Sequence, residues 1–391
     1  MLEVQMVQAV FMEVLNWNRA RINFLSNFII ALIKVKNVNL VEIATAFSGK
    51  AKKDSKYKRI KRFFASFPID SFLIAKLIIQ MLSLKDDSWP LVMDRTNWKF
   101  GNVNINILML GIAHKGIAFP IFWIFLPKKG NSNTHERIQV LNLFLSSFTV
   151  ERIKFFSADR EFIGKKWFFY LLSMNVPFRI RIRENILASN SRGILVPVKN
   201  LFRDLKVGEH KILEGKRQVC DVELFVVGLL LPSGEYLILV TDKNPDTSVD
   251  DYGQRWEIET LFGCLKSRGF RFEETHMTDP QRLSKLIALL AIAFCWAHIT
   301  GEWLSDQKPI IIKKHGRKAI SIFRYGFDYL REIVLNIFER YQEFKELVEL
   351  LRKYLTSDPL CFSCKISSKN KSCSEYTVNQ LESTVNPAIA A

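Results

Sequence analysis

The sequence lacks the features of a membrane-spanning or secreted protein. Its most apolar helical run, Leu286–Ala297, has only twelve residues between Lys285 and His298, fewer than the roughly 20 that span a bilayer. The start of the chain has no basic segment followed by an apolar one, so no secretory signal is expected. No internal repeats are found either. We therefore expect a cytoplasmic protein with no membrane partner.

Cysteine and acidic residues are also scarce. The six cysteines among 391 residues are scattered, as is typical of reduced thiols in a cytoplasm. Cys361 and Cys364 have the spacing of zinc ligands with Cys373 nearby, but no fourth ligand follows. The 39 acidic residues are outnumbered by 56 basic ones, giving a net charge of +17. This excess favours a polyanionic partner such as nucleic acid, although many basic proteins bind none.

The chain is long enough for two to four domains, and its 48% hydrophobic content allows a large core. Residues 1–86 are predicted to be helical, because apolar positions recur every three or four residues. The helical patterns are Phe11–Ile33, Leu40–Phe47 and Ile60–Leu82. Asn39 is expected to cap the second helix and Gly49 to end it.

A basic cluster between Lys52 and Arg62 holds seven basic residues and one acid. Two short helices around a polar turn, the second of them basic, resemble a helix-turn-helix, and a solvated charged face explains the pattern equally well. If the cluster binds DNA, residues 1–86 are the domain that recognises DNA ends. The candidate contacts are Lys56, Lys58, Arg59, Lys61 and Arg62.

From Trp89 the pattern changes to an α/β fold. Runs rich in Val, Ile and aromatic residues predict strands at "WPLVMD", "NINILMLGIAH", "IAFPIFWIFLP", "RIKFFSAD" and "PFRIRIR". Helices are expected from a Thr134 cap through Phe148 and at Glu161–Met174, between these strands.

A β-rich segment and further helices follow. Val196–Asp242 predicts a small β unit, and Pro280–Trp303 and Ile320–Tyr354 predict helices. Ser, Asn and Lys dominate the end of the chain, which favours a disordered tail. The expected regions are a catalytic domain at 87–185 and 246–300, a β-rich insertion at 186–245, a helical region at 301–356 and the tail at 357–391.

The stretch "YGQRWEIETLFGCLK" predicts one amphipathic helix with an unusual polar edge. Tyr252, Arg255, Glu259 and Lys266 follow one another at offsets of 0, 3, 7 and 14, which places them within about 60° on a helix. An ordinary surface helix with an Arg255–Glu259 pair would also explain this edge.

Two further acids follow buried strands. Asp94 closes "PLVMD" and Asp159 closes "IKFFSAD"; each alone is often a cap or turn residue. With Glu259 they offer three carboxylates to Mg²⁺ or Mn²⁺, cations that prefer oxygen ligands and bind phosphate. Two such ions can activate a nucleophile and stabilise the leaving oxygen at phosphorus. Arg255, Lys266 and Arg160 would hold the phosphate.

The motifs "MDRTNW", "SADREF" and Y-x2-R-x3-E-x6-K occur in this order, with the β-rich stretch before the last. In this the chain resembles bacterial insertion-sequence transposases of the DDE group, specifically family four, defined by its Tyr-Arg-Glu-Lys signature. The similarity extends through "GNSNTHER", "ETHMTDPQRL" and "IKKHGRKAISIFRYGFD", over about Trp89 to Leu330.

The resemblance implies a ribonuclease-H-like catalytic core interrupted by the β insertion, and cut-and-paste transposition. Asp94, Asp159 and Glu259 would be catalytic metal ligands. Tyr252, Arg255 and Lys266 would contact DNA near the cleaved phosphate, with Trp256 beside them. The partners would be double-stranded DNA, both terminal inverted repeats and target, and a second copy of the chain on paired ends. The protein would be nucleoid-associated in a bacterial cytoplasm.

The chain departs from the family at one point. Better-studied members form a terminal DNA hairpin and stack an aromatic residue of the insertion on a flipped base, but here no Trp occurs between Trp167 and Trp256. Phe202, Phe225 or Tyr236 could take that role.

Three other functions remain open from the sequence. They are a catalytically silent DNA-binding protein derived from a transposase, a metal-dependent nuclease without strand transfer, and a glycosidase. The intact motifs disfavour the first, and the basic flanks disfavour the last because they suit phosphate better than sugar.

Overall fold

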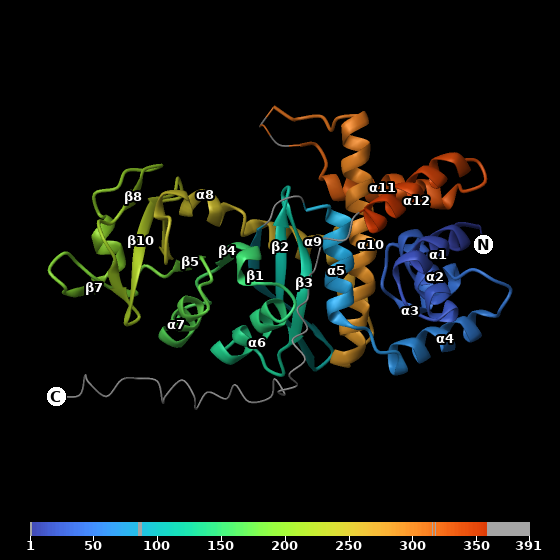
Figure 1. The fold of residues 1–391 in the computed structure, drawn as a ribbon, viewed down its shortest axis with the longest axis horizontal. Coiled ribbons are helices and arrows are strands. Elements are labelled where there is room, and N and C mark those ends of the chain that lie inside the picture. The colour runs from blue at the N-terminus through green and yellow to red at the C-terminus, as the bar shows by residue number, and fades with distance from the viewer. Residues whose placement is uncertain (1, 85–87, 315, 317, 358–391) are drawn as a thin grey trace. The chain divides into compact units, whose positions relative to one another are not determined.

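The α/β fold expected from the sequence is confirmed by the structure, a computed structural model that describes residues 2–84, 88–314, 316 and 318–357 (Figure 1). The helices are α1 (Leu2–Val14), α2 (Arg19–Val35), α3 (Leu40–Ala46), α4 (Lys53–Ser66), α5 (Ser71–Leu82), α6 (Thr134–Leu145), α7 (Lys165–Ser173), α8 (Ser248–Gly253), α9 (Trp256–Leu265), α10 (Pro280–Gln307), α11 (Ile322–Leu335) and α12 (Tyr341–Thr356). The strands are β1 (Trp89–Phe100), β2 (Val103–His114), β3 (Ile117–Phe125), β4 (Ile153–Ala158), β5 (Phe178–Ile182), β6 (Leu187–Ser189), β7 (Leu195–Pro197), β8 (His210–Ile212), β9 (Arg217–Val219), β10 (Val222–Leu230) and β11 (Tyr236–Thr241).

Local capping explains where several helices begin. The Asn39 side chain accepts a hydrogen bond from the Val41 N–H at 2.9 Å, which confirms the predicted cap of α3. Asn18 caps α2 in the same way and divides the single pattern expected over Phe11–Ile33 into two helices. At α6 the cap is Asn133 instead of Thr134, because Asn133 and Glu136 form a reciprocal capping box.

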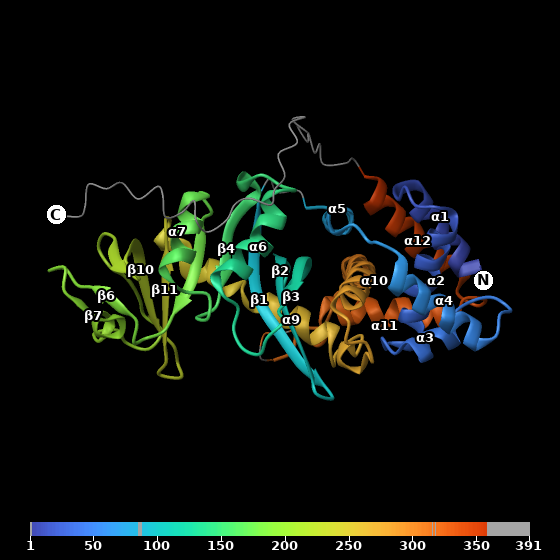
Figure 2. The same cartoon turned by 90° about the horizontal axis from the view of Figure 1, so that it is seen from below.

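A mixed sheet carries the core, in the order β3-β2-β1-β4-β5-β11-β10-β9-β6-β7, with β8 paired to β10. β1, β2 and β3 are antiparallel neighbours, whereas β1, β4 and β5 run parallel. This part of the sheet, with helices before and after it in the chain, is consistent with a ribonuclease-H-like core. Strands β6–β11, the β-rich stretch, extend the sheet from β5 because β11 pairs with β5 (Figure 2).

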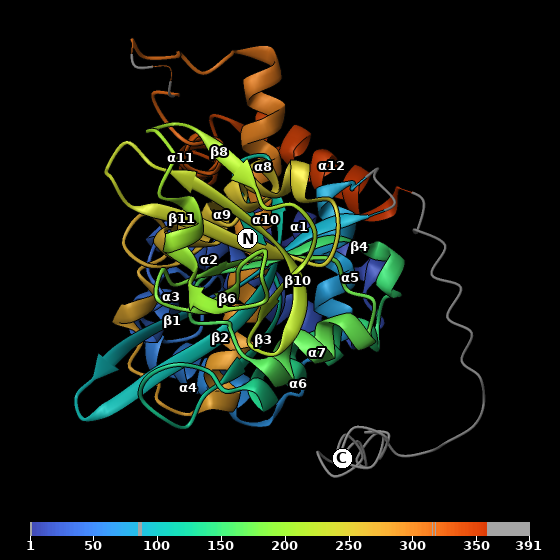
Figure 3. The ribbon, with the colours of Figure 1, turned by 90° about the vertical axis from the view of Figure 1, so that its left-hand side faces the viewer.

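The β1–β2 hairpin corrects the expected end of the first strand. β1 continues through "RTNW" to Phe100, because it pairs with β2 as far as Val103. The hairpin extends beyond the strands beside it (Figures 2 and 3). Asp94 therefore lies in the middle of β1 and not at its end, whereas Asp159 directly follows β4 as predicted.

The longest helix, α10, packs against α2, α4, α5, α11, α12 and β3. Its 28 residues make it long and apolar enough to cross a membrane, which corrects the length expected from its most apolar run. The bent helix pairs α2 with α3 and α4 with α5 would also be long and apolar enough to cross a membrane if each pair is taken as one span. Protein buries 89% of the most apolar window of α10. Its apolar composition is thus accounted for by packing on every side.

Helices α10 and α11 cross with their backbones in contact at two glycines. A Cβ atom added to Gly301 would lie 2.0 Å from the Ile322 carbonyl oxygen, and one added to Gly326 would lie 2.0 Å from the Ala297 carbonyl oxygen. Only glycine permits this approach, since any side chain would force the helices apart.

Within the described part of the chain Cys220, Cys264 and Cys295 are free thiols, as expected. Cys361, Cys364 and Cys373 lie outside the described residues, as does the tail predicted from residue 357, except for Ser357 itself.

Candidate active site

The stretch "YGQRWEIETLFGCLK" is two helices and not the single helix that its spacing predicts. α8 ends at Gly253 and α9 begins at Trp256, with Arg255 at the junction. Tyr252 is buried in an apolar cluster with Val227 and Leu237 of the extended sheet. Tyr252 and Arg255 are both buried, so the predicted polar edge is not exposed along its whole length.

Asp94, on β1, is a largely buried carboxylate among charges. One of its oxygens accepts the Arg95 backbone N–H at 2.7 Å, and the other lies 3.6 Å from the Arg255 guanidinium. Burial raises the pKa of Asp94 to about 6, and the nearby carboxylates of Glu161 and Asp159 raise it as well, although Arg255 opposes them. Burial is therefore the main reason why the Asp94 carboxyl holds its proton more firmly than an exposed aspartate does.

Asp159, which follows β4, is hydrogen-bonded to Tyr252 of α8. The Tyr252 hydroxyl donates to a carboxylate oxygen of Asp159 at 3.3 Å. Burial raises the pKa of Tyr252, and the negative charge of Asp159 adds to the increase. The phenol therefore stays protonated at neutral pH and acts as a hydrogen-bond donor to this carboxylate.

Arg255 lies between the carboxylates of Asp94 and Glu259. Its Nη2 donates to Glu259 at 2.8 Å while Nη1 faces Asp94, and the guanidinium is only 3% exposed. Its Nε and Nη1 are buried without a hydrogen-bond acceptor. The half-exposed Trp256 ring covers it at 4.5 Å. Burial lowers the pKa of Arg255, but Tyr252, Glu259 and Asp159 outweigh burial and raise it overall. The buried guanidinium of Arg255 thus contacts three other predicted site residues, Asp94, Glu259 and Trp256.

The other two predicted cations have acidic partners. Lys266, at the end of α9, pairs with Glu273 at 2.9 Å and lies 5.5 Å from the Trp98 ring centroid. Arg160 is half-exposed and lies 3.4 Å from Glu235. Both sit near solvent and can exchange these partners for phosphate at low cost.

Glu161 is a fourth carboxylate at the candidate site, and the sequence motifs did not predict it. It lies 3.4 Å from the Arg95 guanidinium, and its second oxygen is buried without a partner. Its position two residues after Asp159, in "DRE", is the sequence feature that could have indicated a place near the site. Glu161 therefore adds acceptor capacity beside Asp94.

The carboxylate oxygens of Asp94, Asp159 and Glu259 are donors of the kind that Mg²⁺ prefers. Among residues 2–84, 88–314, 316 and 318–357, however, no three His, Cys, Asp or Glu side chains are grouped to hold one ion. Asp94 and Glu259 do not lie next to each other, because the Arg255 guanidinium lies between them.

The predicted DNA contacts of α4 divide into two kinds. Lys56 donates to the Phe47 carbonyl at 2.6 Å and Arg59 to Asn23 at 3.0 Å, so both help to pack α4 on its neighbours. The remaining three, Lys58, Lys61 and Arg62, are exposed. Arg59 and Arg62 line a hollow of about 370 Å³ with Arg21 and the rings of Phe24 and Phe63. Burial lowers the pKa of Arg59, and the neighbouring Arg62 lowers it further.

Of the aromatic residues considered in the insertion, Phe202 is fully buried, and its ring would lie 2.5 Å from a Cβ atom at Gly228. Phe225 and Tyr236 are half-buried. Phe202 is therefore unsuited to stacking on a base, whereas the other two retain accessible edges.

Arg137 fastens the loops around Asp159. This buried side chain donates to the Ser132 hydroxyl and carbonyl at 3.0 and 2.6 Å, and to the carbonyls of Glu161 at 2.8 Å and Ile163 at 3.3 Å. It thereby joins the "GNSNTHER" loop to the segment after β4.

Replacement of Arg137 by methionine is expected to destabilise the protein by about 2 kcal/mol, because several buried carbonyls lose their donor. DNA cleavage should fall as well, since the segment bearing Asp159 loses its anchor. Chemical denaturation and a cleavage assay measure the two effects. Arg192→Met, at an exposed position, is the matched control, and equal stability of both variants would contradict the anchoring role.

Comparison with known proteins bears on this site. Residues 121–296 match the family model of the transposase DDE domain. This part of the chain is therefore similar to the DDE domain of transposases, a family that is generally dependent on divalent metals. It includes Asp159 and Glu259 and begins after β1, the strand that carries Asp94. A comparison with curated proteins found no match.

Proposed function

We propose that this protein is a transposase of family four of the DDE group, which cuts its insertion sequence from DNA and transfers the freed strands to a target. One observation supports this most strongly. In a chain whose residues 121–296 match the transposase DDE domain, Arg255 lies between Asp94 and Glu259, and its neighbour Tyr252 donates to Asp159. Charged groups that are buried together are concentrated at functional sites.

The three carboxylates are proposed to hold Mg²⁺, or alternatively Mn²⁺. When bound, the ions would supply an activated nucleophile and stabilise the leaving oxygen at phosphorus. Glu161 lies close enough to support the ligands. The Tyr252 hydroxyl orients Asp159 through its hydrogen bond.

Arg255 is proposed to exchange partners during the reaction. It lies between two acids, and its Nε and Nη1 have no hydrogen-bond acceptor. A phosphodiester oxygen arriving at the site would satisfy those donors. Arg255 would then grip the phosphate and release Glu259, whose carboxylate is half-exposed. Lys266, Arg160 and the half-exposed Trp256 would contact the flanking DNA.

The helical region of residues 1–86 is proposed to recognise the element's terminal inverted repeats. Its exposed Lys58, Lys61 and Arg62, and the arginine-lined hollow beside them, suit phosphate contacts. Two copies of the chain would bind a pair of ends, and the work would take place at the nucleoid of a bacterial cytoplasm. Phe225 or Tyr236 would stack on a displaced base if a DNA hairpin forms.

Arg255→Lys is expected to reduce DNA cleavage by at least about tenfold, or roughly 1.4 kcal/mol, because one ammonium cannot contact two acceptors as a guanidinium does. Cleavage of DNA carrying the element's ends and thermal unfolding should be measured on the same variant. Arg192→Lys is the matched control. Normal cleavage with slightly lowered stability would mean that Arg255 is only the partner of Glu259 in an ordinary helix.

The two alternatives separate by their products. A catalytically silent DNA-binding protein would bind DNA containing the ends without cutting it. A nuclease would cut it without joining the ends to a target. Inverted repeats flanked by short direct duplications around the gene would favour transposition over both.

A further inference from the structure

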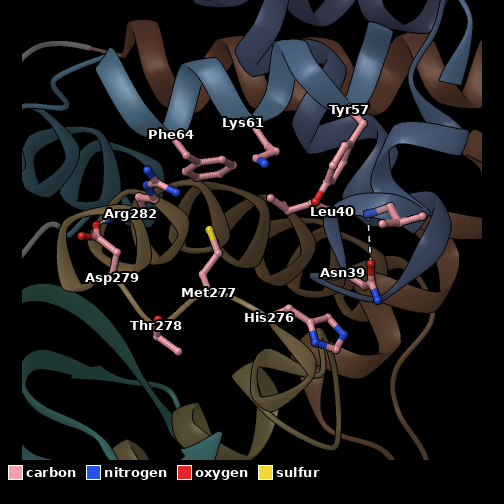
Figure 4. Close-up of a pocket in the computed structure, with 11 residues that line it drawn as sticks. Asn39, Leu40, Tyr57, Lys61, Phe64, His276, Met277, Thr278, Asp279 and Arg282 are labelled. Carbon is pink, nitrogen blue, oxygen red and sulfur yellow. Dashed lines mark hydrogen bonds between the residues drawn. The ribbon is translucent and has the colours of Figure 1, made fainter. Parts of the chain in front are cut away.

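A pocket unconnected with the carboxylates lies between α4 and the segment that leads into α10 (Figure 4). Here called the α4–α10 pocket, it has a volume of about 390 Å³. Tyr57, Lys61 and Phe64 project into it from α4, and His276, Met277 and Arg282 face them. A space of this size accommodates one nucleotide or a comparable small molecule.

Two of the polar side chains that line the pocket, Lys61 and Arg282, are cationic. Lys61, Arg282 and His276 are exposed at its rim. The acid among its lining residues is Asp279, whose carboxylate is used as the cap of α10 and accepts the Arg282 backbone N–H at 2.8 Å. The basic side chains at the rim can therefore bind an anion, because the carboxylate of Asp279 is already hydrogen-bonded to the backbone of α10.

The walls are apolar and aromatic. The Tyr57 ring is half-buried, and the Lys61 ammonium lies 5.7 Å from its centroid. Met277 is half-buried and points toward α4 from the opposite wall. An aromatic face, a thioether and a nearby ammonium suit a planar base attached to a phosphate.

Two contacts fix the elements around the pocket, and neither involves Lys61 or Arg282. Lys285 of α10 donates to the Phe64 carbonyl at 2.8 Å and so fixes the end of α4 on α10. On the other side the His276 ring contacts Phe100, at the end of β1, with centroids 5.3 Å apart. The pocket therefore adjoins the hairpin strand that bears Asp94.

From these observations we propose that the α4–α10 pocket binds one nucleotide unit of a DNA strand. Its phosphate pairs with Lys61 and Arg282, and its base packs on Tyr57 and Met277. The inference rests on the proposed function, because DNA is the substrate there. It adds a nucleotide site that the catalytic motifs do not include, joining the basic helix α4 to the entry of α10.

The test measures binding of the full chain to a fluorescent single-stranded DNA across a range of salt concentrations. Lys61→Ala and Arg282→Ala should each weaken binding several-fold at low salt and reduce the salt slope by about 0.7, the value for one phosphate of a single strand. Tyr57→Ala should weaken binding by about tenfold, whereas Tyr57→Phe retains the ring and the affinity. DNA substituted with 5-iododeoxyuridine should form a photocrosslink to Tyr57.

Lys345→Ala and Tyr341→Ala, at exposed positions of α12, are the matched controls, and unfolding curves identify any variant that fails to fold. Pocket variants that bind DNA as the controls do would overturn the proposal. So would a Tyr57→Ala variant with unchanged affinity, or free nucleoside monophosphate that competes as well as the strand.

Cleavage by the wild-type chain, measured in parallel, separates this inference from the proposed function. If the wild-type chain cleaves DNA normally and the pocket variants bind DNA with unchanged affinity, the nucleotide site is overturned and the transposase proposal is not. Absent cleavage with weakened binding of those variants would overturn the transposase proposal and leave the nucleotide site in place.

Discussion

Replacement of Glu259 by alanine is expected to abolish cleavage of DNA that carries the element's ends, with at least about a 10³-fold loss of rate. Stabilisation by a bound metal contributes several kcal/mol to such a reaction, and each 1.36 kcal/mol is tenfold. Asp94→Ala and Asp159→Ala should have the same effect. DNA affinity should persist, because removing negative charge does not weaken phosphate contacts. Chelation of divalent ions should reproduce the loss in the wild type, and added Mg²⁺ should reverse it.

Asp250→Ala is the matched control for these variants, since this exposed acid lies on α8 and is not one of the three proposed ligands. Cleavage at the wild-type rate by Glu259→Ala in the presence of Mg²⁺ would show that the three carboxylates are not the catalytic set. Loss of cleavage in the control as well would point to general disruption of α8 and α9.

Gly326→Ala is expected to lower the free energy of unfolding by about 3 kcal/mol. The added methyl group would meet the Ala297 carbonyl at 2.0 Å and the Gly301 nitrogen at 2.2 Å. Backbone atoms of a buried helix cannot yield as a flexible side chain would, so α10 and α11 must separate and lose their packing.

Denaturant-induced unfolding of Gly326→Ala and Gly253→Ala provides the comparison. A Cβ atom at Gly253 meets nothing within 4 Å, so this helical substitution should leave stability unchanged or raise it by up to about 1 kcal/mol. Similar unfolding midpoints for the two variants would refute the close crossing of α10 and α11.

Local signals in the sequence were sufficient for the fold class and for many element positions. Alternating or continuous apolar runs located the strands around Asp159, and Asn39 marked the start of α3. The errors arose where tertiary contacts override local preference. Pairing with β2 carries β1 past Asp94, and the expected single helix is interrupted between Gly253 and Trp256, next to Tyr252, which is buried against β10 and β11.

The candidate site was predictable in composition but not in arrangement. Asp94 and Asp159 were selected because they follow buried strands, and Glu259 because of its helical spacing. No local pattern indicates that Arg255 lies between Asp94 and Glu259 or that Glu161 lies near Asp94. The α4–α10 pocket was inaccessible to such reasoning, because Tyr57 and Arg282 are brought together only by the packing of α4 near α10.

The late position of α10 in the chain has a consequence for biosynthesis. This helix is the buried partner of α2, α4 and α5, yet its residues emerge from the ribosome only after the entire sheet has been translated. Until then the early helices hold an apolar surface without its cover, a state prone to aggregation and to capture by chaperones. Polypeptides released before Gln307 should therefore accumulate as insoluble or proteolysed material. Synthesis of the protein would then yield folded molecules only from chains translated through this helix.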